Sequence, residues 1–486
     1  MQFLIIGFDG MRADLLTPDL TPNLSALASL GVTFANHRCV YPSETFVNLS
    51  SLVTGSPPAA HGMVANRFVN PDVDPGEVFD PSSVALVEKA QRRYGGALYT
   101  TPSLGELLGD AGLRMAVIST LYPGLVRLKH HRIDAYPHLS FACSSLETSV
   151  PQEAIAAIVE RLGPPPKDAA PNLSVLPYAT DVFLDMASRE GLPDVTVLWF
   201  VEPDDSCHAF GVGSAEMRQA LRCADAQLGR IVDWWQGSAY ADTLQIIVTS
   251  DHGQITQTQP VGVGDHLRGL GFRVAGDLGE ACDCSIVPDY SGNIRLARPD
   301  PGLRRDLVEA LMSLDHCGMI FTRSGDDPCE GVVPGTFGLN MVQAEHPRAS
   351  DIHYILRADD AVNAAGYDGA CCFENDLAIG SSYHGGLYPA ELAAACVASG
   401  SHFKARVRSP IPSGIVDIAP TILNALGIPR PETMTGRVLE EAIALSTASV
   451  NPTVDSFDVG VGRYRQHLRR SNVNGSVYLE AGWRSA

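Results

Sequence analysis

The chain has 486 residues, of which 45% are hydrophobic and 19% are charged, so it can bury a large core and is longer than a single minimal domain. Its formal net charge is −20 and its isoelectric point is near 5.0. This charge argues against a protein that binds long nucleic acids, because such binding needs clustered Lys and Arg side chains. A small anionic substrate is compatible with the charge if bound cations reverse the local field.

The chain begins with the apolar run 3–8, which has neither a basic segment before it nor a small-residue cleavage site after it. This pattern predicts a β-strand and no signal peptide. We expect no membrane partner, since no run of about 18 apolar residues occurs. The eleven cysteines are irregularly spaced and lack zinc-ribbon spacing. We therefore expect a reduced, cytoplasmic protein.

Short apolar runs alternate with amphipathic segments along the chain, a pattern typical of α/β proteins. The continuous runs that predict strands covered on both faces are Phe3–Phe8, Met115–Ser119, Thr196–Val201 and Leu244–Thr249. The segment from Ser214 to Gln236 predicts a helix that begins after a Ser cap and packs an apolar stripe into the core. Asp417 to Leu426 predicts another helix, which ends at Gly427. We expect an α/β/α sandwich around a central, mostly parallel sheet.

The chain divides into three predicted parts. Residues 1–262 and 377–445 are expected to form the catalytic core. The segment 263–376 is richer in Pro, Gly and Asp and has weaker periodicity, which indicates an inserted cap or lid. Residues 446–486 show no strong helix or strand pattern, so we expect them to extend over the core or to contact another subunit of a homo-oligomer.

Residue types that bind metals follow several of the apolar runs. They are Asp9, Asp204, His208, Asp251, His252 and His384. The carboxyl ends of parallel strands meet at one edge of a sheet, so these side chains can converge on one site. Asp204 and His208 are four residues apart, and on a helical turn both would point to one side and chelate one cation. Taken alone, Asp9 is more often a turn-forming residue than a ligand.

Thr45 precedes a segment with helical character, Leu49 to Val53. A hydroxyl group at a helix N-terminus lies at the positive end of the helix dipole, beside free backbone N–H groups that also suit a phosphate. The alternative is that Ser43 or Thr45 only caps the helix. Together with the six metal-ligand residue types, Thr45 predicts a two-metal enzyme of phosphoryl or sulfuryl transfer.

Five ordered segments resemble the alkaline phosphatase superfamily and, within it, the nucleotide pyrophosphatase/phosphodiesterase branch. They are Thr45-Phe46, Leu52–Gly55, His61–Asn66, Glu202–Asp204 with His208, and Thr249–Gly253. The resemblance covers roughly residues 1–255 and 380–430 and is weak in between. It implies a hydrolase that acts on small phosphorylated substrates, namely nucleotide-like phosphodiesters or pyrophosphates.

The resemblance also implies two zinc ions and a threonine nucleophile. One zinc would be held by Asp204, His208 and His384, and the other by Asp9, Asp251, His252 and Thr45. Thr45 would attack phosphorus and form a phosphothreonine intermediate, which water then hydrolyses. Mixed carboxylate and imidazole ligands suit zinc, although the sequence leaves manganese or iron open.

Three further residues are assigned by the same resemblance. Asn66 is similar to an amide that donates to a phosphoryl oxygen, with a turn residue after Gly62 as the alternative. Phe46 and Trp199 correspond in position to aromatic residues that stack on a nucleobase. The alternative for Trp199 is a core residue of a strand.

Some features depart from the branch and leave other reactions open. Cys207 stands before His208 where the branch usually has Gly, and the His-Gly-Gly segment at His384 is similar to phosphonoacetate hydrolases. With Arg127 and Lys129 as candidate carboxylate ligands, a carbon–phosphorus hydrolase is the main alternative. A phosphomonoesterase is less favoured, because no Arg lies beside Thr45 in the sequence to bind a dianionic phosphate. A sulfatase is disfavoured because the Cys/Ser-x-Pro-x-Arg segment of sulfatases is absent around Thr45. An inactive binding protein is disfavoured because it would have lost one of the site residues, and all of them are present.

Overall fold

The computed structural model describes residues 1–279 and 281–485, and its centre is an eight-stranded sheet of order β21-β2-β20-β9-β1-β8-β6-β7. The strands are β1 (Gln2–Phe8), β2 (Val32–Phe34), β6 (Met115–Ser119), β7 (Leu139–Ala142), β8 (Val195–Phe200), β9 (Leu244–Thr249), β20 (Cys396–Ser399) and β21 (Val407–Ser409). From β9 through β7 all neighbours are parallel, whereas β20 is antiparallel to β9 and β2. The predicted α/β fold with a mostly parallel sheet is confirmed.

The side chains of β1 alternate between two apolar cores, because successive residues of a strand point to opposite faces. Leu4 and Ile6 belong to one core, and Phe3 and Ile5 belong to the other. The helices over the first face are α1 (Pro22–Leu30), α7 (Gln152–Leu162), α8 (Val175–Arg189) and α10 (Ala215–Gly237). Those over the second face are α2 (Thr45–Thr54), α5 (Leu104–Asp110), α6 (Pro123–Lys129) and α14 (Ile418–Ala425). The sheet is therefore covered on both sides.

Both predicted core helices are present. The Ser214 side chain caps α10 by accepting a hydrogen bond from the backbone N–H of Met217, and Gly427, just beyond α14, has a φ of 70°. The remaining helices are α3 (Pro58–His61), α4 (Val84–Arg93), α9 (Asp204–Phe210), α11 (Val263–Gly269), α12 (Pro301–Ser313) and α13 (Pro389–Leu392). Two short sheets have two strands each. One pairs β3 (His37–Arg38) with β22 (Ser413–Gly414), and the other pairs β4 (Phe68–Val69) with β5 (Val78–Phe79).

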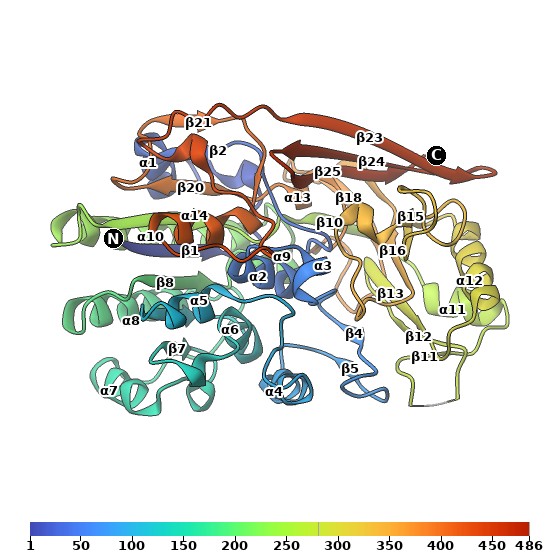
Figure 1. The fold of residues 1–486 in the computed structure, drawn as a ribbon, viewed down its shortest axis with the longest axis horizontal. Coiled ribbons are helices and arrows are strands. Elements are labelled where there is room, and N and C mark those ends of the chain that lie inside the picture. The colour runs from blue at the N-terminus through green and yellow to red at the C-terminus, as the bar shows by residue number, and fades with distance from the viewer. Residues whose placement is uncertain (280, 486) are drawn as a thin grey trace.

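The segment predicted as a cap contains its own six-stranded sheet, of order β11-β12-β13-β16-β14-β15. These strands are β11 (Val274–Ala275), β12 (Cys284–Val287), β13 (Ser291–Leu296), β14 (Cys317–Thr322), β15 (Phe337–Gly338) and β16 (Ile352–Leu356). Together with α11 and α12 they form the right-hand part of the molecule in Figure 1, beside the central sheet. We refer to this part as the cap.

A four-stranded sheet joins the cap to the core. It consists of β17 (Ala358–Val362), β18 (Asp368–Phe373), β10 (Ile255–Pro260) and β19 (Ser382–Tyr383), in that order. The strands β10 and β19 come from segments predicted to belong to the core, and β17 and β18 come from the segment predicted to be the cap. The predicted boundaries at 262 and 377 therefore fall between strands of one sheet.

The C-terminal segment was expected to lack strong elements, and this prediction is wrong. It forms an antiparallel sheet of β23 (Thr453–Val461), β24 (Tyr464–Val473) and β25 (Ser476–Arg484). The alternation of apolar and polar residues is interrupted on β24 because its buried face carries Gln466. The Gln466 amide accepts a hydrogen bond from Ile320 N and donates to the carbonyls of Ile320 and Gly335. In Figure 1 this sheet lies along the top of the molecule.

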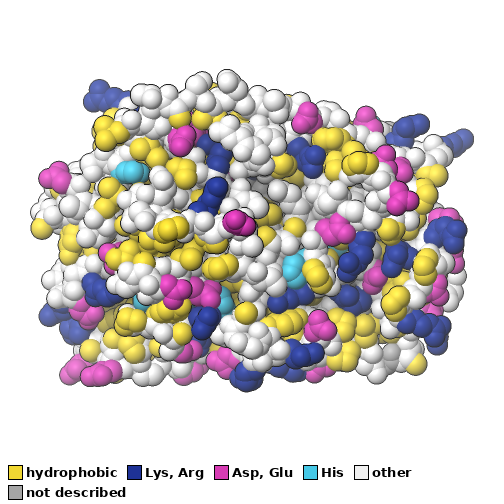
Figure 2. Space-filling view, viewed as in Figure 1, with side chains coloured by type: hydrophobic (Ala, Val, Ile, Leu, Met, Phe, Trp, Pro, Cys, Tyr) yellow, Lys and Arg dark blue, Asp and Glu magenta, His cyan; other side chains and the backbone are white. Residues whose placement is uncertain are grey.

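Asp and Glu side chains are spread over the face shown in Figure 2, with Lys and Arg among them. The negative net charge is thus distributed on this face and is not gathered in one acidic patch. Within the described residues, no helix has both the length and the apolar composition that crossing a membrane requires.

Candidate active site

The predicted metal-ligand side chains converge at the carboxyl ends of three neighbouring strands. Asp9 follows β1, Asp204 begins α9 shortly after β8, and Asp251 and His252 follow β9. These strands are adjacent and parallel, so their carboxyl ends share one edge of the sheet. Asp9, Asp251 and His252 are fully buried.

Tight loops fix the carboxylates of this site. The backbone N–H of Gly10 donates to Asp251 Oδ1 at 3.1 Å, and the Gln254 amide donates to Asp204 Oδ1 at 2.6 Å. Gly10 has a φ of +66°, and a Cβ there would lie 2.7 Å from Asp204 Oδ1. Only glycine fits this turn without displacing Asp204.

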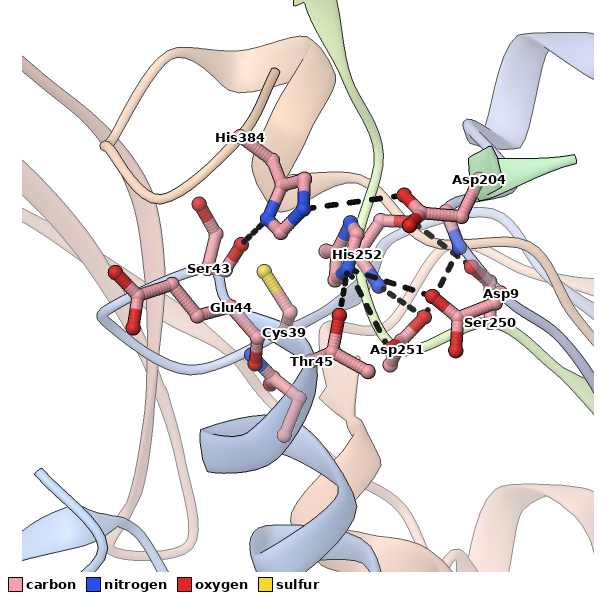
Figure 3. A network of polar contacts seen from close by, with 12 residues as sticks. Asp9, Cys39, Ser43, Glu44, Thr45, Asp204, Ser250, Asp251, His252 and His384 are labelled. Carbon is pink, nitrogen blue, oxygen red and sulfur yellow. Dashed lines mark hydrogen bonds and ion pairs between the residues drawn. The ribbon is translucent and has the colours of Figure 1, made fainter. Parts of the chain in front are cut away.

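Three histidines present the same ring nitrogen to the centre of the site. The Nδ1–H groups of His208, His252 and His384 donate to the backbone carbonyls of Ser382, Gly253 and Ser43 at 2.8, 3.0 and 2.8 Å. With Nδ1 as the donor, Nε2 is the ring nitrogen that each histidine turns toward the carboxylates and the hydroxyl of the site. Histidines that bind metals are held in this manner by a hydrogen bond at the other nitrogen. Figure 3 shows His252, His384 and Asp204 facing one another from different segments.

The donor set fits bound cations. Ligand atoms gather in two groups, Asp204 with His208 and His384, and Asp9 with Asp204 and His252. Asp9 Oδ1 and Asp251 Oδ2 are buried and have no hydrogen-bond partner among the described residues, and they lie 3.8 and 3.4 Å from His252 Nε2. Unpaired carboxylate oxygens next to imidazole nitrogens are ligands that suit a divalent cation. Asp204 thus lies between the two predicted sites.

The carboxylates of the site lie close together and are buried away from water. Burial, followed by the carboxylates of Asp251 and Asp204, raises the pKa of Asp9 well above its usual value. Burial likewise raises the pKa of Asp251. A bound cation would relieve both effects, since it neutralises the carboxylates that burial disfavours.

Thr45 lies at the N-terminus of α2, and its Oγ1 is 3.0 Å from His252 Nε2. The hydroxyl therefore lies at the edge of the group formed by Asp9, Asp204 and His252. Asn66 accepts a hydrogen bond from Phe46 N at 2.9 Å through Oδ1. This contact orients the amide of Asn66, which lines the cavity beside Thr45.

A cavity of about 300 Å³ opens over the site. The apolar and aromatic residues that line it include Phe46, Leu121, Tyr122 and Leu125. The polar residues that line it include Glu44, Ser291, Asp289, Asn293 and Tyr383. Three of these, Asp289, Ser291 and Asn293, belong to the cap, so core and cap both contribute to the wall.

The stacking role predicted for Trp199 is contradicted by its position. The ring is fully buried in the sheet, where its Nε1–H donates to Asp9 Oδ2 at 2.8 Å. Gly7 on β1 leaves room for it, because a Cβ there would lie 2.0 Å from the indole. Trp199 therefore positions a predicted ligand. Tyr122, which is 57% exposed, is an aromatic residue that lines the cavity together with Phe46.

The basic residues that favoured a phosphonate substrate do not line the cavity. Lys129 is fully buried, and its ammonium lies 5.4 Å from the centre of the Trp199 ring. Arg127 makes an ion pair with Asp134 at 2.8 Å. Neither side chain is among those that surround the cavity.

Sequence analysis missed three residues that surround the predicted ligands: Tyr122, Gln254 and Asp289. Tyr122 follows the end of β6, as the predicted ligands follow the ends of other strands, and this signal was available. Asp289 lies between β12 and β13 of the cap, where weak periodicity gave no indication of a strand end.

Comparison with known proteins identifies the family to which the chain is similar. The profile of the Type I phosphodiesterase / nucleotide pyrophosphatase family matches residues 3–274. Human ectonucleotide pyrophosphatase/phosphodiesterase family member 1 is 28% identical over 254 residues, which cover 51% of this chain and 23% of that protein. Mouse bis(5'-adenosyl)-triphosphatase enpp4 is 28% identical over 255 residues, which cover 52% of this chain and 47% of that protein. The chain thus matches less than half of the length of each relative.

Solved structures extend the likeness to the whole fold. Human ectonucleotide pyrophosphatase/phosphodiesterase 5 superposes with a TM-score of 0.63 over 89% of this chain and 96% of that one, at 17% sequence identity. An inactive form of the murine protein in complex with AMP has a TM-score of 0.62 at 17% identity. At such identity the likeness shows the fold alone. Because the family profile covers more than half of the residues, the chain belongs to the type I phosphodiesterase / nucleotide pyrophosphatase family, whose named members are hydrolases.

Proposed function

We propose that this protein is a two-zinc hydrolase that cleaves phosphodiester or pyrophosphate bonds of nucleotide-like substrates through a phosphothreonine intermediate. The observation that carries the proposal is the position of Thr45 Oγ1, 3.0 Å from His252 Nε2, at the edge of a group of metal-ligand side chains. The apolar and aromatic residues that line the cavity supply a place for a base.

His208, His384 and Asp204 would hold one cation, and Asp9, Asp251 and His252 would hold the other, with Asp204 between them. When bound, the two cations lower the pKa of the Thr45 hydroxyl, offset the charge on the phosphoryl oxygens and stabilise the leaving oxygen. The carbonyl groups that accept from the three Nδ1 atoms keep the imidazoles in the orientation that this binding needs.

Thr45 attacks phosphorus in line, so a bond from Oγ1 to phosphorus forms while the bond to the leaving oxygen breaks on the opposite side. Asn66, held by its hydrogen bond from Phe46 N, directs its amide N–H groups to a non-bridging oxygen and favours the transition state by about 3 kcal/mol. Water then enters from the side that the leaving group vacated and hydrolyses the phosphothreonine. The two inversions give net retention at phosphorus.

The base lies between Phe46 and Tyr122 in this proposal. Both rings line the cavity, together with Leu121 and Leu125. Stacking on an aromatic ring contributes about 1–3 kcal/mol per base and tolerates different bases. The protein therefore accepts several nucleotides.

The cavity favours diesters over monoesters and phosphonates. Arg67 is the basic side chain among the described residues that line it, but its guanidinium is half exposed and lies 3.8 Å from Asp80. A dianionic monoester needs a cationic side chain bound to its oxygens, and phosphonoacetate needs one for its carboxylate. The diester needs neither.

The test is hydrolysis by the zinc-loaded protein of p-nitrophenyl thymidine 5′-monophosphate, p-nitrophenyl phosphate and phosphonoacetate. We expect kcat/KM for the diester to exceed the monoester value by about 100-fold, because one extra charge on the substrate would lack a partner. Turnover of phosphonoacetate alone would overturn the proposal and identify a carbon–phosphorus hydrolase. Equal rates for monoester and diester would identify a phosphomonoesterase.

A further inference from the structure

Lys129 is a fully buried basic residue that the proposed mechanism does not use. It is the last residue of α6, and its ammonium donates to Ser119 Oγ and to the carbonyl of Leu125, both at 3.5 Å. These distances are longer than the usual N–H···O distance of about 2.7–3.2 Å. The contacts of this ammonium with the described residues include no ion pair. Because a lysine is almost never fully buried without an acidic partner, its position calls for a cause.

The Trp199 indole connects Lys129 to the predicted metal ligands. The ammonium lies over the face of this ring, 5.4 Å from its centre, which is within the range of about 6 Å for cation–π attraction. The edge of the same ring donates from Nε1 to Asp9 Oδ2 at 2.8 Å. Trp199 pairs with Ser119 across β8 and β6, so two of the groups that contact the ammonium lie at the carboxyl ends of these strands.

The carboxylates of the site act on Lys129 across this ring. Burial lowers the pKa of Lys129 to about 7, and the negative charges of Asp9 and Asp251 oppose this change. The effect is mutual, since Lys129 lowers the pKa of Asp9 against the larger effects of burial and of the neighbouring carboxylates. The ammonium is therefore a countercharge to buried carboxylates that it does not touch.

The sign of the charge that faces Lys129 depends on bound cations. The metal-free site carries the negative charges of Asp9, Asp204 and Asp251, which attract the ammonium. Two divalent cations outweigh three carboxylates, so the loaded site repels the same ammonium. The free energy needed to bury the ammonium is common to both forms. It cancels when the metal-free and the zinc-loaded protein are compared, and the effect of the charge remains.

We propose that Lys129 stands in for the catalytic cations when they are absent, so that it stabilises the metal-free site and weakens the binding of zinc. Lys129 is thus a positioning residue, which acts on Asp9 through the Trp199 ring and through its charge. The inference rests on the proposed two-zinc function. In the metal-free protein the carboxylates stay together around this internal charge, and the site is ready to receive metal.

The experiment is a calorimetric titration of zinc into the metal-free, full-length protein and its Lys129→Met variant, with a competing chelator. A pH of 6.5 lies below the pKa of Lys129. Methionine keeps an unbranched side chain and removes the charge, so we expect the variant to bind zinc about tenfold more tightly. Zinc should also raise the midpoint of thermal unfolding by more in the variant than in the wild-type protein.

The direction of this change separates the charge of Lys129 from a role in packing. If Lys129 only supported the Trp199 ring, its loss would displace the partner of Asp9 and weaken zinc binding. Equal or weaker binding of zinc by Lys129→Met would therefore overturn the inference while leaving the two-zinc proposal standing. A wild-type protein that binds no zinc would overturn the two-zinc proposal itself.

Arg348→Met is the matched control. Arg348 is another buried cation over an aromatic ring, 3.9 Å from the centre of Tyr94, and it lies outside both groups of metal-ligand side chains. We expect this variant to be less stable than the wild-type protein and to keep the wild-type affinity for zinc. Tighter zinc binding in both variants would contradict the assignment to Lys129.

A double variant tests the same inference without zinc and covers a Lys129→Met protein that does not fold alone. Asp9→Asn removes one of the charges that Lys129 offsets. We expect it to raise the midpoint of thermal unfolding of the metal-free protein by more in the Lys129→Met background than in the wild-type background, where the countercharge is still present. An equal or smaller effect, or a double variant that also fails to fold, would overturn the inference.

Discussion

Thr45 has a single chemical task in the proposed mechanism, and its hydroxyl oxygen is the atom on which the task depends. We expect Thr45→Ala to lower kcat for the nitrophenyl diester by about 10⁴-fold, since loss of a covalent nucleophile removes the reaction path and leaves binding and electrostatic assistance. Metal content, measured by elemental analysis, should stay near two zinc ions per chain. Thr45→Ser is the matched control, because it keeps a hydroxyl and should keep partial turnover. Turnover of the Ala variant at the wild-type rate would refute the assignment.

Trp199 acts on the site through Asp9. Trp199→Phe keeps an aromatic ring in the sheet and removes the N–H group that donates to Asp9 Oδ2 at 2.8 Å. Loss of such a partner lowers metal affinity by about 10–100-fold, which calorimetric zinc titration would measure. Trp234→Phe, in a ring pair with Phe183 away from the site, is the control. An unchanged zinc affinity in Trp199→Phe would show that the indole only fills space.

Individual residues differ in how far the sequence could predict them. The convergence of the predicted ligands Asp9, Asp204, Asp251 and His252 could be expected because each lies close after an apolar run, and the end of a strand is a local signal. Trp199 was misplaced because β8 is buried on both faces, so alternation cannot tell which side of the sheet a residue faces. Its place depends on the absent side chain of Gly7, which lies on another strand.

At the scale of elements, Gln466 joins β24 to β14. Gln466→Leu removes the acceptor of Ile320 N and the donor to the carbonyls of Ile320 and Gly335, and these backbone groups stay buried. We expect the free energy of unfolding to fall by about 2–4 kcal/mol, since each unsatisfied group costs about 1–3 kcal/mol. Urea unfolding measures the change, and Gln91→Leu on α4 serves as a control on a helix distant from the contact. A loss equal to that of the control would mean that β24 docks without this side chain.

His353 on β16 gives the cap a dependence on pH. Burial lowers the pKa of His353 to about 3, below the value of about 6.5 in an unfolded chain. Between these two values the His353 imidazole binds a proton in the unfolded state but not in the folded state. The free energy of unfolding therefore decreases as pH falls from 6.5 toward 3. We expect the free energy of unfolding of the wild-type protein to decrease between pH 7 and pH 5 by about 2 kcal/mol more than that of His353→Gln. Urea unfolding at both pH values tests this, and an unchanged difference would contradict it.

A helix or strand could be predicted where the sequence pattern that indicates it lies within a single segment. The apolar runs of β1, β6, β8 and β9, and the stripe and Ser214 cap of α10, needed no partner to be recognised. The strand β24 was missed because its buried polar residue is satisfied by β14, more than a hundred residues away along the chain. Contacts of this range leave no periodicity in the sequence.

At the scale of the molecule, the site links segments from Asp9 to His384. Its buried carboxylates repel one another unless cations neutralise them, so binding should stabilise the whole fold. We expect removal of metal by a chelator to lower the midpoint of thermal unfolding by about 3 °C, corresponding to about 3 kcal/mol of linked binding energy in a chain of this length. Differential scanning calorimetry would measure the shift. Metal-free Asp9→Asn should melt above the metal-free wild-type protein, because one repelling charge is gone; the reverse order would argue against repulsion as the cause.

The four-stranded sheet that joins core and cap has a consequence for how new specificities arise in this architecture. The strand β10 starts three residues after His252, and β19 ends next to His384, while β18 pairs with β10. Backbone hydrogen bonds thus connect a strand of the cap segment directly to the segments that carry His252 and His384. Exchange of the whole cap would therefore also displace the strands beside these imidazoles, whereas a point substitution within the cap would leave them in place.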